Sequence, residues 1–343
     1  MTVRAGVIGL GFMGRQYVKF LHQLEGVKVS AVCDIRQEVA QELAEATGAQ
    51  RFAGAEELAS SADVDVVFVC TPEDHHVPAA LAAINAGKAV LIEKPLAHTL
   101  EAGRTIIRAA QAQGALVMVG HLLRFEPRWA AARRIVASGD IGEVISISTR
   151  RIGNVLDQQV LRGRTSIPLY YGVHDLDIVR WFAGTEATSI FAARRTGALR
   201  SLGYPIDDLY SVVLEFDGNI LATAQLGWHV PAAAVSAPTT GFSVVGTRGT
   251  VMIEQADTGL QYWAESGVRS VNPITDVMFW PEVHAVPGGA LANELTHFVQ
   301  CVRKQAQPII SVEDAFEALR LSLAMEASAD QRAPIQLSGF ESL

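Results

Sequence analysis

Apolar residues in the first third of the chain fall into two alternating patterns. Short continuous apolar runs are typical of parallel strands buried on both faces. Between them lie segments with apolar residues at helical spacing, several of which stop at a glycine. The expected strands cover 3–10, 27–33, 50–52, 65–70, 89–92 and 116–119, and the expected helices cover 13–24, 36–47, 55–60, 77–86 and 100–113. This order predicts a doubly wound parallel sheet.

After residue 123 single apolar and polar residues alternate, which indicates antiparallel strands with one buried face. Two hairpins are expected, 210–216 with 220–228 around the turn Asp217-Gly218-Asn219, and 242–246 with 250–254 around Arg248-Gly249. Helices are expected over 127–138, 169–183, 291–305 and 312–328. The prediction is an α/β chain of two domains. A doubly wound parallel sheet occupies 1–122, and an α+β domain with a large, mostly antiparallel open sheet occupies 123–343.

Composition narrows the class of protein. The length of 343 residues suits two domains, and the formal net charge of -8 argues against a nucleic-acid partner. No apolar run approaches the roughly eighteen residues that span a bilayer, so no membrane association is expected. The three cysteines share no metal-type spacing, and no metal site is predicted. Because the chain runs from its first residues into a strand with no room for a signal peptide, we expect a cytoplasmic protein.

A glycine-rich loop follows the first strand and precedes the first helix. Gly9 permits a tight turn, Gly11 lets the backbone approach a pyrophosphate, and Gly14 allows close packing of helix on strand. Asp34 ends the second strand twenty residues after Gly14, which is the separation at which an acid meets a ribose 2′-hydroxyl. A purely structural glycine turn is the alternative. The combination favours a dinucleotide site.

The same segment bears on the choice of dinucleotide. The Asp34 carboxylate would repel a 2′-phosphate, which favours NAD over NADP. Arg36 acts in the opposite direction, because a guanidinium can pair with that phosphate. NAD is therefore the expected cofactor. The residues predicted to touch it around the loop and the second strand are Gly9, Gly11, Phe12, Met13, Gly14, Asp34, Ile35 and Arg36.

The tripeptide Glu93-Lys94-Pro95 ends another apolar run. Open α/β sheets bind their ligands at the carboxyl ends of the strands, where this lysine is expected. A charged lysine beside a dinucleotide site indicates redox chemistry at a carbonyl or hydroxyl group. The alternative is a surface lysine paired with Glu93.

Several motifs together give the chain a family resemblance. They are the glycine loop, Thr71-Pro72 followed by His76, Ala86-Gly87-Lys88 before Glu93-Lys94-Pro95, the segment 120–127, and His174-Asp175-Leu176-Asp177 before Arg180-Trp181. With them the chain resembles the glucose–fructose oxidoreductase / inositol dehydrogenase / MocA-type family. The resemblance implies a Rossmann domain followed by a domain built on a large open sheet. It implies hydride transfer between a nicotinamide and a sugar, inositol or related polyol, with dimers or tetramers formed through that sheet. It also implies a cis Lys94–Pro95 peptide.

The resemblance assigns roles by position. Lys94 corresponds to the catalytic lysine that stabilises the reacting oxygen, and His174 corresponds to the general acid/base. Glu93, Thr71, Pro72 and His76 correspond to residues next to the cofactor.

Tyr170 departs from the common pattern of the family. Many members have an aspartate four residues before the histidine, and here that position is Tyr170. Because i and i+4 share a helix face, Tyr170 and His174 are expected to point into one site, and either one can be the acid/base. Tyr171 is expected to face elsewhere. The alternative for Tyr170 is an aromatic core residue.

A further set of polar and aromatic side chains is predicted to line the substrate pocket. The set is Arg124, Asn154, Asp157, Arg164, Asp175 and Trp228. Arg164, with Arg162 beside it, either recognises an acidic substituent of the substrate or belongs to a solvated basic loop.

The sequence as a whole predicts an NAD(P)-dependent dehydrogenase that acts on a secondary hydroxyl of a sugar, inositol or related polyol. Two alternatives belong to other classes: a glycosidase that uses bound NAD for transient oxidation, and a non-catalytic nicotinamide-binding regulator. The identity of the sugar, the direction of the reaction, and the choice between dimer and tetramer stay open.

Overall fold

The computed structural model describes residues 2–155, 157–230, 239–254, 262–264, 267–269 and 279–341. The chain forms two compact units. Met1–Leu122 and Glu282–Leu319 make up the first, and Leu123–Pro281 and Arg320–Leu343 make up the second. The segment 282–319, which the sequence predicts in the second domain, therefore groups with the parallel sheet. An apolar helix pattern does not specify which of two sheets the helix covers.

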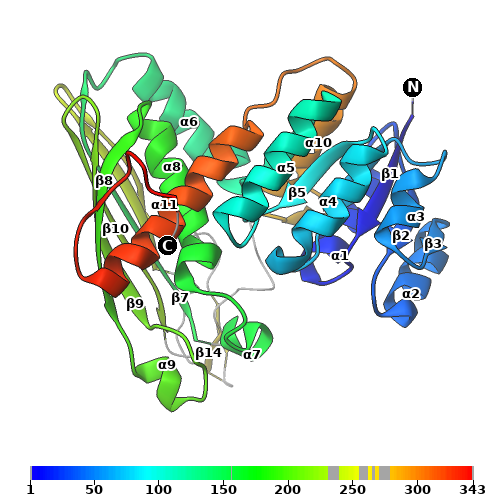
Figure 1. Cartoon of the computed structure of the whole chain (residues 1–343), viewed down its shortest axis with the longest axis horizontal. Helices are drawn as coiled ribbons and strands as arrows, with labels where there is room; N and C mark the ends of the chain where they lie inside the picture. The colour runs from blue at the N-terminus through cyan, green and yellow to red at the C-terminus, as the bar shows by residue number, and fades with distance from the viewer. Residues whose placement is uncertain are drawn as a thin grey trace. The chain divides into compact units, whose positions relative to one another are not determined.

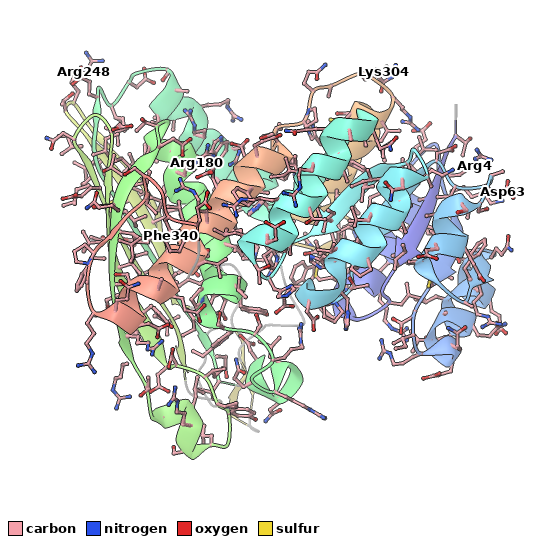
Figure 2. The ribbon with its side chains drawn as sticks, in the orientation of Figure 1. Arg4, Asp63, Arg180, Arg248, Lys304 and Phe340 are labelled. Atoms are coloured by element: carbon pink, nitrogen blue, oxygen red, sulfur yellow. The ribbon has the colours of Figure 1, made fainter. Side chains whose placement is uncertain are left out.

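The first unit is built on a six-stranded parallel sheet in the order β3-β2-β1-β4-β5-β6, which confirms the predicted doubly wound topology. Its strands are β1 (Val3–Ile8), β2 (Val27–Cys33), β3 (Gln50–Phe52), β4 (Val66–Val69), β5 (Ala89–Glu93) and β6 (Val117–Gly120). Arg4 of β1 pairs with Asp63 at 3.3 Å and Asp65 at 2.7 Å, in the loop before β4 (Figure 2).

Helices cover both faces of this sheet. They are α1 (Phe12–Gln23), α2 (Gln37–Thr47), α3 (Ala55–Ser60), α4 (His76–Asn85), α5 (Leu100–Gln113) and α10 (Gly289–Val302). On one face, Tyr17 of α1 and Phe298 of α10 pack edge-on against Phe68 of β4. On the other face, Leu58 of α3 approaches Gly6 of β1, and α4 and α5 lie side by side (Figure 1).

The second unit is built on a seven-stranded sheet in the order β12-β11-β7-β10-β9-β8-β17. Adjacent strands in this sheet are antiparallel, except for the parallel pair β7 and β10. The predicted mostly antiparallel open sheet is therefore confirmed. The strands are β7 (Val144–Asn154), β8 (Ala187–Arg195), β9 (Leu209–Phe216), β10 (Ile220–Val230), β11 (Thr239–Gly246), β12 (Thr250–Glu254) and β17 (Ile335–Gln336). In the first hairpin, Gly218 and Asn219 both have positive φ, as a tight hairpin turn requires.

Helices lie along one face of this sheet (Figure 1), chiefly α6, α8 and α11. The helical segments of this unit are η2 (Leu122–Phe125), α6 (Pro127–Ala137), α7 (Asp157–Leu161), the π-helical turn η3 (Pro168–Gly172), α8 (Val173–Ala183) and α9 (Ala198–Ser201). The helix α11 (Val312–Gln331) begins in the first unit and continues into the second from Arg320. The other face exposes apolar side chains from several strands. Among them are Phe191, Val213, Leu221 and Met252.

Two short hairpins complete the description, β13 (Tyr262–Ala264) with β14 (Gly267–Arg269) and β15 (Glu282–Val283) with β16 (Val286–Pro287). Among the helices within the described ranges, none is both long and apolar enough to cross a bilayer.

Candidate active site

The glycine loop adopts the conformation that its sequence predicts. Gly9 has φ +87°, and a Cβ there would lie 2.6 Å from the backbone nitrogen of Thr71. A Cβ on Gly14 would overlap the carbonyl oxygen of Gly9. Gly11 caps α1, has nothing within 4 Å of its Cβ position, and leads into a first turn without acidic residues. The helix N-terminus is therefore open to an anion.

Asp34 is fixed to this loop by the backbone. Its Oδ2 accepts from the N–H of Leu10 at 2.6 Å, and its Oδ1 accepts from the N–H of Arg36 at 2.8 Å. Burial alone would raise the pKa of the Asp34 carboxyl. The hydrogen bonds from Arg36 and Leu10 outweigh that effect and hold the pKa below its ordinary value. An ionised acceptor beside the glycine loop fits a ribose diol.

Arg36 turns toward Asp34, with Nε 3.2 Å from Oδ1. Apolar side chains around the loop are unusually open, since Phe12 is 60% and Ile35 is 94% exposed, while Met13 is half-buried. Exposed apolar residues of this size next to a polar anchor are typical of a ligand surface. The loop, the open helix end and Asp34 thus fit a dinucleotide.

The ends of β4 and β5 are tied together by a buried histidine. His76 is 1% exposed, and its Nδ1 lies 2.8 Å from the carbonyl oxygen of Pro95 while Nε2 lies 2.9 Å from that of Thr71. Burial lowers the pKa of His76, and the hydrogen bonds to the two carbonyl groups oppose that shift. The buried ring thus joins the strand ends that carry Thr71 and Lys94, and the position of His76 next to the cofactor stays a prediction.

Thr71 itself presents an unusual group. Its Oγ1 is buried and has no hydrogen-bond partner among the described residues. Such a hydroxyl at the carboxyl end of β4 fits the predicted contact with the cofactor. Pro72 beside it is exposed.

Lys94 follows β5 directly, and its backbone N–H donates to Oε2 of Glu93 at 3.1 Å. The Lys94–Pro95 peptide is cis, as the family resemblance implied. The Glu93 side chain is 7% exposed. It therefore points into the unit and not to solvent.

In the second unit, Tyr170 lies in the π-helical turn η3 and His174 in the first turn of α8. Both side chains are half-buried. The Tyr170 ring packs on Trp228, with centroids 5.3 Å apart, and on Tyr171 at 4.9 Å. The expectation that Tyr171 faces elsewhere is wrong, because the Tyr171 ring also contacts Trp228, at 5.1 Å.

Asp157 joins these aromatic residues. Its Oδ2 accepts from the Tyr171 hydroxyl at 2.8 Å and from Nε1 of Trp228 at 3.2 Å. Burial raises the pKa of Asp157, while the two hydrogen bonds act in the opposite direction. Trp228 is fully buried and offers no ring face to a sugar, so its influence on a substrate passes through Asp157 or Tyr170. Sequence reasoning missed Tyr171, although Gly153 beside it signals a close approach: a Cβ there would overlap the Tyr171 hydroxyl.

Two other predicted pocket residues are held in buried ion pairs. Arg124 donates to Asp177 through Nε at 2.9 Å and Nη2 at 2.6 Å. Asp175 accepts from Arg151 Nε and Thr149 Oγ1, each at 2.5 Å. These pairs anchor α8, and contact of Arg124 or Asp175 with a substrate stays a prediction.

The remaining predicted residues are Asn154, Arg162 and Arg164. Asn154 ends β7 and is half-buried, while Arg162 and Arg164 are exposed in the segment before η3. Lys94 belongs to the first unit and Tyr170 and His174 to the second. The meeting of these three side chains in one site therefore also stays a prediction.

Comparison with known proteins bears on both units. Residues 3–121 match the family described as "Oxidoreductase family, NAD-binding Rossmann fold", and residues 129–252 match the "GFO/IDH/MocA C-terminal domain". Inositol 2-dehydrogenase 2 of Saccharopolyspora erythraea is 35% identical over 236 residues, covering 66% of this chain and 67% of that protein. The chain belongs to the GFO/IDH/MocA family.

Other members of the GFO/IDH/MocA family match over nearly the whole chain. The scyllo-inositol 2-dehydrogenase (NAD(+)) of Bacillus subtilis (strain 168) is 27% identical over 354 residues, covering 98% of this chain and 96% of that protein. The crystal structure of myo-inositol 2-dehydrogenase from Lactobacillus plantarum has a TM-score of 0.84 at 22% identity, covering 98% of this chain and 99% of that one, and so shows the shared fold. Membership confirms the predicted NAD-linked oxidoreductase, with NAD as the cofactor.

Proposed function

We propose that this GFO/IDH/MocA protein oxidises a secondary hydroxyl of an inositol or a closely related cyclic polyol or sugar, with NAD+ as the hydride acceptor. The observation that carries the proposal is the end-to-end match to an NAD+-dependent scyllo-inositol 2-dehydrogenase, over 98% of this chain. The ionised Asp34 beside the glycine loop and the cis Lys94–Pro95 junction support it from the structure.

The residues of the first unit hold and orient the cofactor in this proposal. The open N-terminus of α1 binds the pyrophosphate, Asp34 accepts from the ribose, and Thr71 Oγ1 gains a partner. Bound NAD+ supplies an acceptor for hydride at nicotinamide C4. Lys94 provides the positive charge that stabilises alkoxide character on the substrate oxygen.

The residues of the second unit handle the proton. Either Tyr170 or His174 accepts it from the hydroxyl that is oxidised. Asp157, through Tyr171 and Trp228, positions the aromatic surface on which the Tyr170 ring packs. Asn154 and Arg164 belong to the proposed substrate contacts.

The first experiment mixes the purified protein with NAD+ or NADP+ and a panel of inositols, aldoses, uronates and anhydrosugars, and follows the absorbance of the reduced cofactor. Reduction of NAD+ with an inositol or related polyol is expected. Tyr170→Phe and His174→Gln then separate the two candidate bases, because the base that acts loses far more turnover. Arg162→Gln/Arg164→Gln tests the acidic-substituent hypothesis, which an unchanged substrate profile would reject.

The alternatives predict other outcomes. A glycosidase with transient oxidation would hydrolyse a sugar without net release of NADH. A regulator would bind the cofactor and turn over nothing in the panel. Either result would contradict the dehydrogenase proposal.

We also propose that copies of the chain assemble through the exposed face of the second-unit sheet. Apolar side chains from β8, β9, β10 and β12 remain 39–60% exposed there. They are Phe191, Val213, Leu221 and Met252. Light scattering should show a dimer or tetramer that Phe191→Lys/Leu221→Lys converts to smaller species. A cytoplasmic location is likewise a proposal, supported by the free thiols of Cys33, Cys70 and Cys301.

A further inference from the structure

Two buried carboxyl groups and a tyrosine lie together in the first unit, and one of the carboxyl groups belongs to Glu93, the residue before Lys94. Glu93 ends β5 and is 7% exposed, Tyr17 of α1 is fully buried, and Glu294 of α10 is 1% exposed. Ionising both carboxyl groups in a buried site costs free energy unless each carboxylate has a cation beside it. The proposed hydride transfer assigns no role to Tyr17 or Glu294.

The Tyr17 hydroxyl lies between the two carboxyl groups. The Tyr17 hydroxyl oxygen is 3.4 Å from Oε2 of Glu294, and hydrogen bonding from Tyr17 acts to lower the pKa of Glu93. Gly120 of β6, opposite Glu93 in the sheet, leaves the space for this meeting. A Cβ on Gly120 would lie 3.2 Å from the Tyr17 hydroxyl oxygen and 3.6 Å from Oε1 of Glu93.

Counting protons decides how these groups are connected. A tyrosine hydroxyl has one proton to donate and lone pairs with which to accept. Burial raises the pKa of Glu93, but the positive charge of Lys94 and the Lys94 N–H, which donates to Glu93 at 3.1 Å, oppose that shift. In the described part of the chain no such cation acts on Glu294, so Glu93 is the better-stabilised of the two carboxylates. The Tyr17 proton therefore goes to Glu93. Glu294 can then bond Tyr17 only by donating a proton of its own.

We propose that Glu294, Tyr17 and Glu93 form a hydrogen-bonded chain in which Glu294 is a neutral carboxylic acid and Glu93 is the carboxylate that balances Lys94. Glu294 and Tyr17 are positioning residues, because they act on the proposed catalytic lysine only through Glu93. The kinetic part of this inference rests on the proposed function, whereas the protonation of Glu294 does not.

The surroundings of Glu294 agree with this assignment. Burial, followed by the charge of Glu93, raises the pKa of Glu294 well above its ordinary range. The titratable and charged groups that face Glu93, Tyr17 and Glu294 are Cys70 of β4 and Lys94 after β5. Burial and the two carboxyl groups raise the pKa of the Cys70 thiol, which therefore stays neutral. Lys94 is thus the one cation among the groups that act on Glu93 and Glu294 within the described residues.

The direct test measures the protonation state by infrared spectroscopy of the full-length protein. The wild-type protein at neutral pH should show the C=O stretch of a protonated carboxyl, which exposed carboxylates do not contribute. Glu294→Gln should remove that band and leave the carboxylate bands unchanged, and Glu313→Gln, on the exposed start of α11, should not remove it. Absence of the band from the wild-type protein, or loss of a carboxylate band in Glu294→Gln, would overturn the proposal. The absence of the protonated-carboxyl band can be tested on the wild-type protein alone, even if a variant does not fold.

The kinetic test follows the acid limb of the pH profile of kcat/KM. Tyr17→Phe removes the donor to Glu93, so the limb should move to higher pH by roughly one unit. Glu294→Gln should keep the limb in place, because the amide N–H can still donate to Tyr17. Tyr204→Phe in the second unit is the matched control.

An unmoved acid limb in Tyr17→Phe would contradict the proposal that Tyr17 acts on Lys94 through Glu93. Absence of dehydrogenase activity in the wild type would contradict the proposed function instead and leave the infrared result to decide the protonation.

Discussion

The Tyr171 hydroxyl donates a 2.8 Å hydrogen bond to Oδ2 of Asp157, which links the short helix α7 to the turn that carries Tyr170. The same oxygen accepts from Trp228, whose ring supports that of Tyr170. No cation pairs with Asp157 through these contacts, and two neutral donors stabilise its carboxylate. One proposed acid/base residue is thus supported by a network whose members do not themselves react.

Removing one donor from this network should be measurable as a loss of stability. Tyr171→Phe removes one of the two donors to Oδ2 of the partly buried Asp157 and leaves the bond from Trp228, at a cost of about 1–2 kcal/mol in the free energy of unfolding. Urea titration gives that quantity, and Tyr204→Phe on the same unit controls for loss of a phenolic hydroxyl. Equal stability of the two variants would show that the Tyr171 bond contributes nothing.

The position of Gly153 gives a steric test of the same network. A Cβ there would overlap the Tyr171 hydroxyl and lie 3.1 Å from Cδ1 of Trp228. Gly153→Ala should therefore lower the free energy of unfolding by about 2 kcal/mol or more and lower turnover by displacing Tyr170.

The matched control is Gly54→Ala, where nothing lies within 4 Å of the Cβ position and φ is -143°. That variant should be as stable as the wild type or slightly more so. If Gly153→Ala and Gly54→Ala have the same free energy of unfolding, the packing around Tyr171 does not require a glycine at position 153.

The sequence predicts the first unit closely because its signals are local. The strand Val27–Cys33 and the helix Leu100–Gln113 have the predicted bounds. Glycines in the left-handed conformation end α2 and α5, at Gly48 and Gly114. Each of these features depends on a few adjacent residues, which the sequence displays directly.

What sequence reasoning missed depends on partners distant in the chain. The central strand β7 carries Arg151, which is buried only because Asp175 of α8 pairs with it. Neither this pairing nor the approach of Glu294 to Tyr17, from helices 277 residues apart in sequence, appears in any local pattern. For the same reason the contacts of the His76 ring with the carbonyl groups of Thr71 and Pro95 could not be predicted from the sequence.

Cofactor choice should depend on Asp34. Asp34→Ser keeps a hydroxyl acceptor but loses the charge that repels a 2′-phosphate, while Arg36 remains to attract one. We expect the ratio of kcat/KM for NAD+ over NADP+ to fall on the order of tenfold, the equivalent of one charge-assisted hydrogen bond. Because Asp34 also holds Leu10, the ratio is the measure and not either constant alone.

The double variant Asp34→Ser/Arg36→Ala separates the two charges. It should recover part of the NAD preference, because the guanidinium that would bind the phosphate is gone. An unchanged ratio in Asp34→Ser would refute the role assigned to Asp34.

Lys94 should matter for turnover and not for cofactor affinity. Lys94→Ala removes the charge that stabilises developing alkoxide, and we expect a loss of about a hundredfold or more in kcat. Fluorescence titration with NADH should give an affinity near that of the wild type. Lys28→Ala, an exposed lysine on β2, is the control. Turnover close to normal in Lys94→Ala would reject the proposed chemistry.

Glu294 also makes stability depend on pH, with a definite sign. Its pKa in the folded protein is raised well above the ordinary value, so the folded state holds a proton that the unfolded chain has released. Its contribution to stability is therefore full below the unfolded pKa of about 4.3 and is lost as pH rises toward the folded value. Glu294→Gln cannot ionise and should remove this dependence. The free energy of unfolding of Glu294→Gln minus that of the wild type should rise with pH by up to about 1.4 kcal/mol per unit across that window. In Glu313→Gln the same difference should stay flat, and a flat difference in Glu294→Gln would mean that Glu294 has the same pKa folded and unfolded.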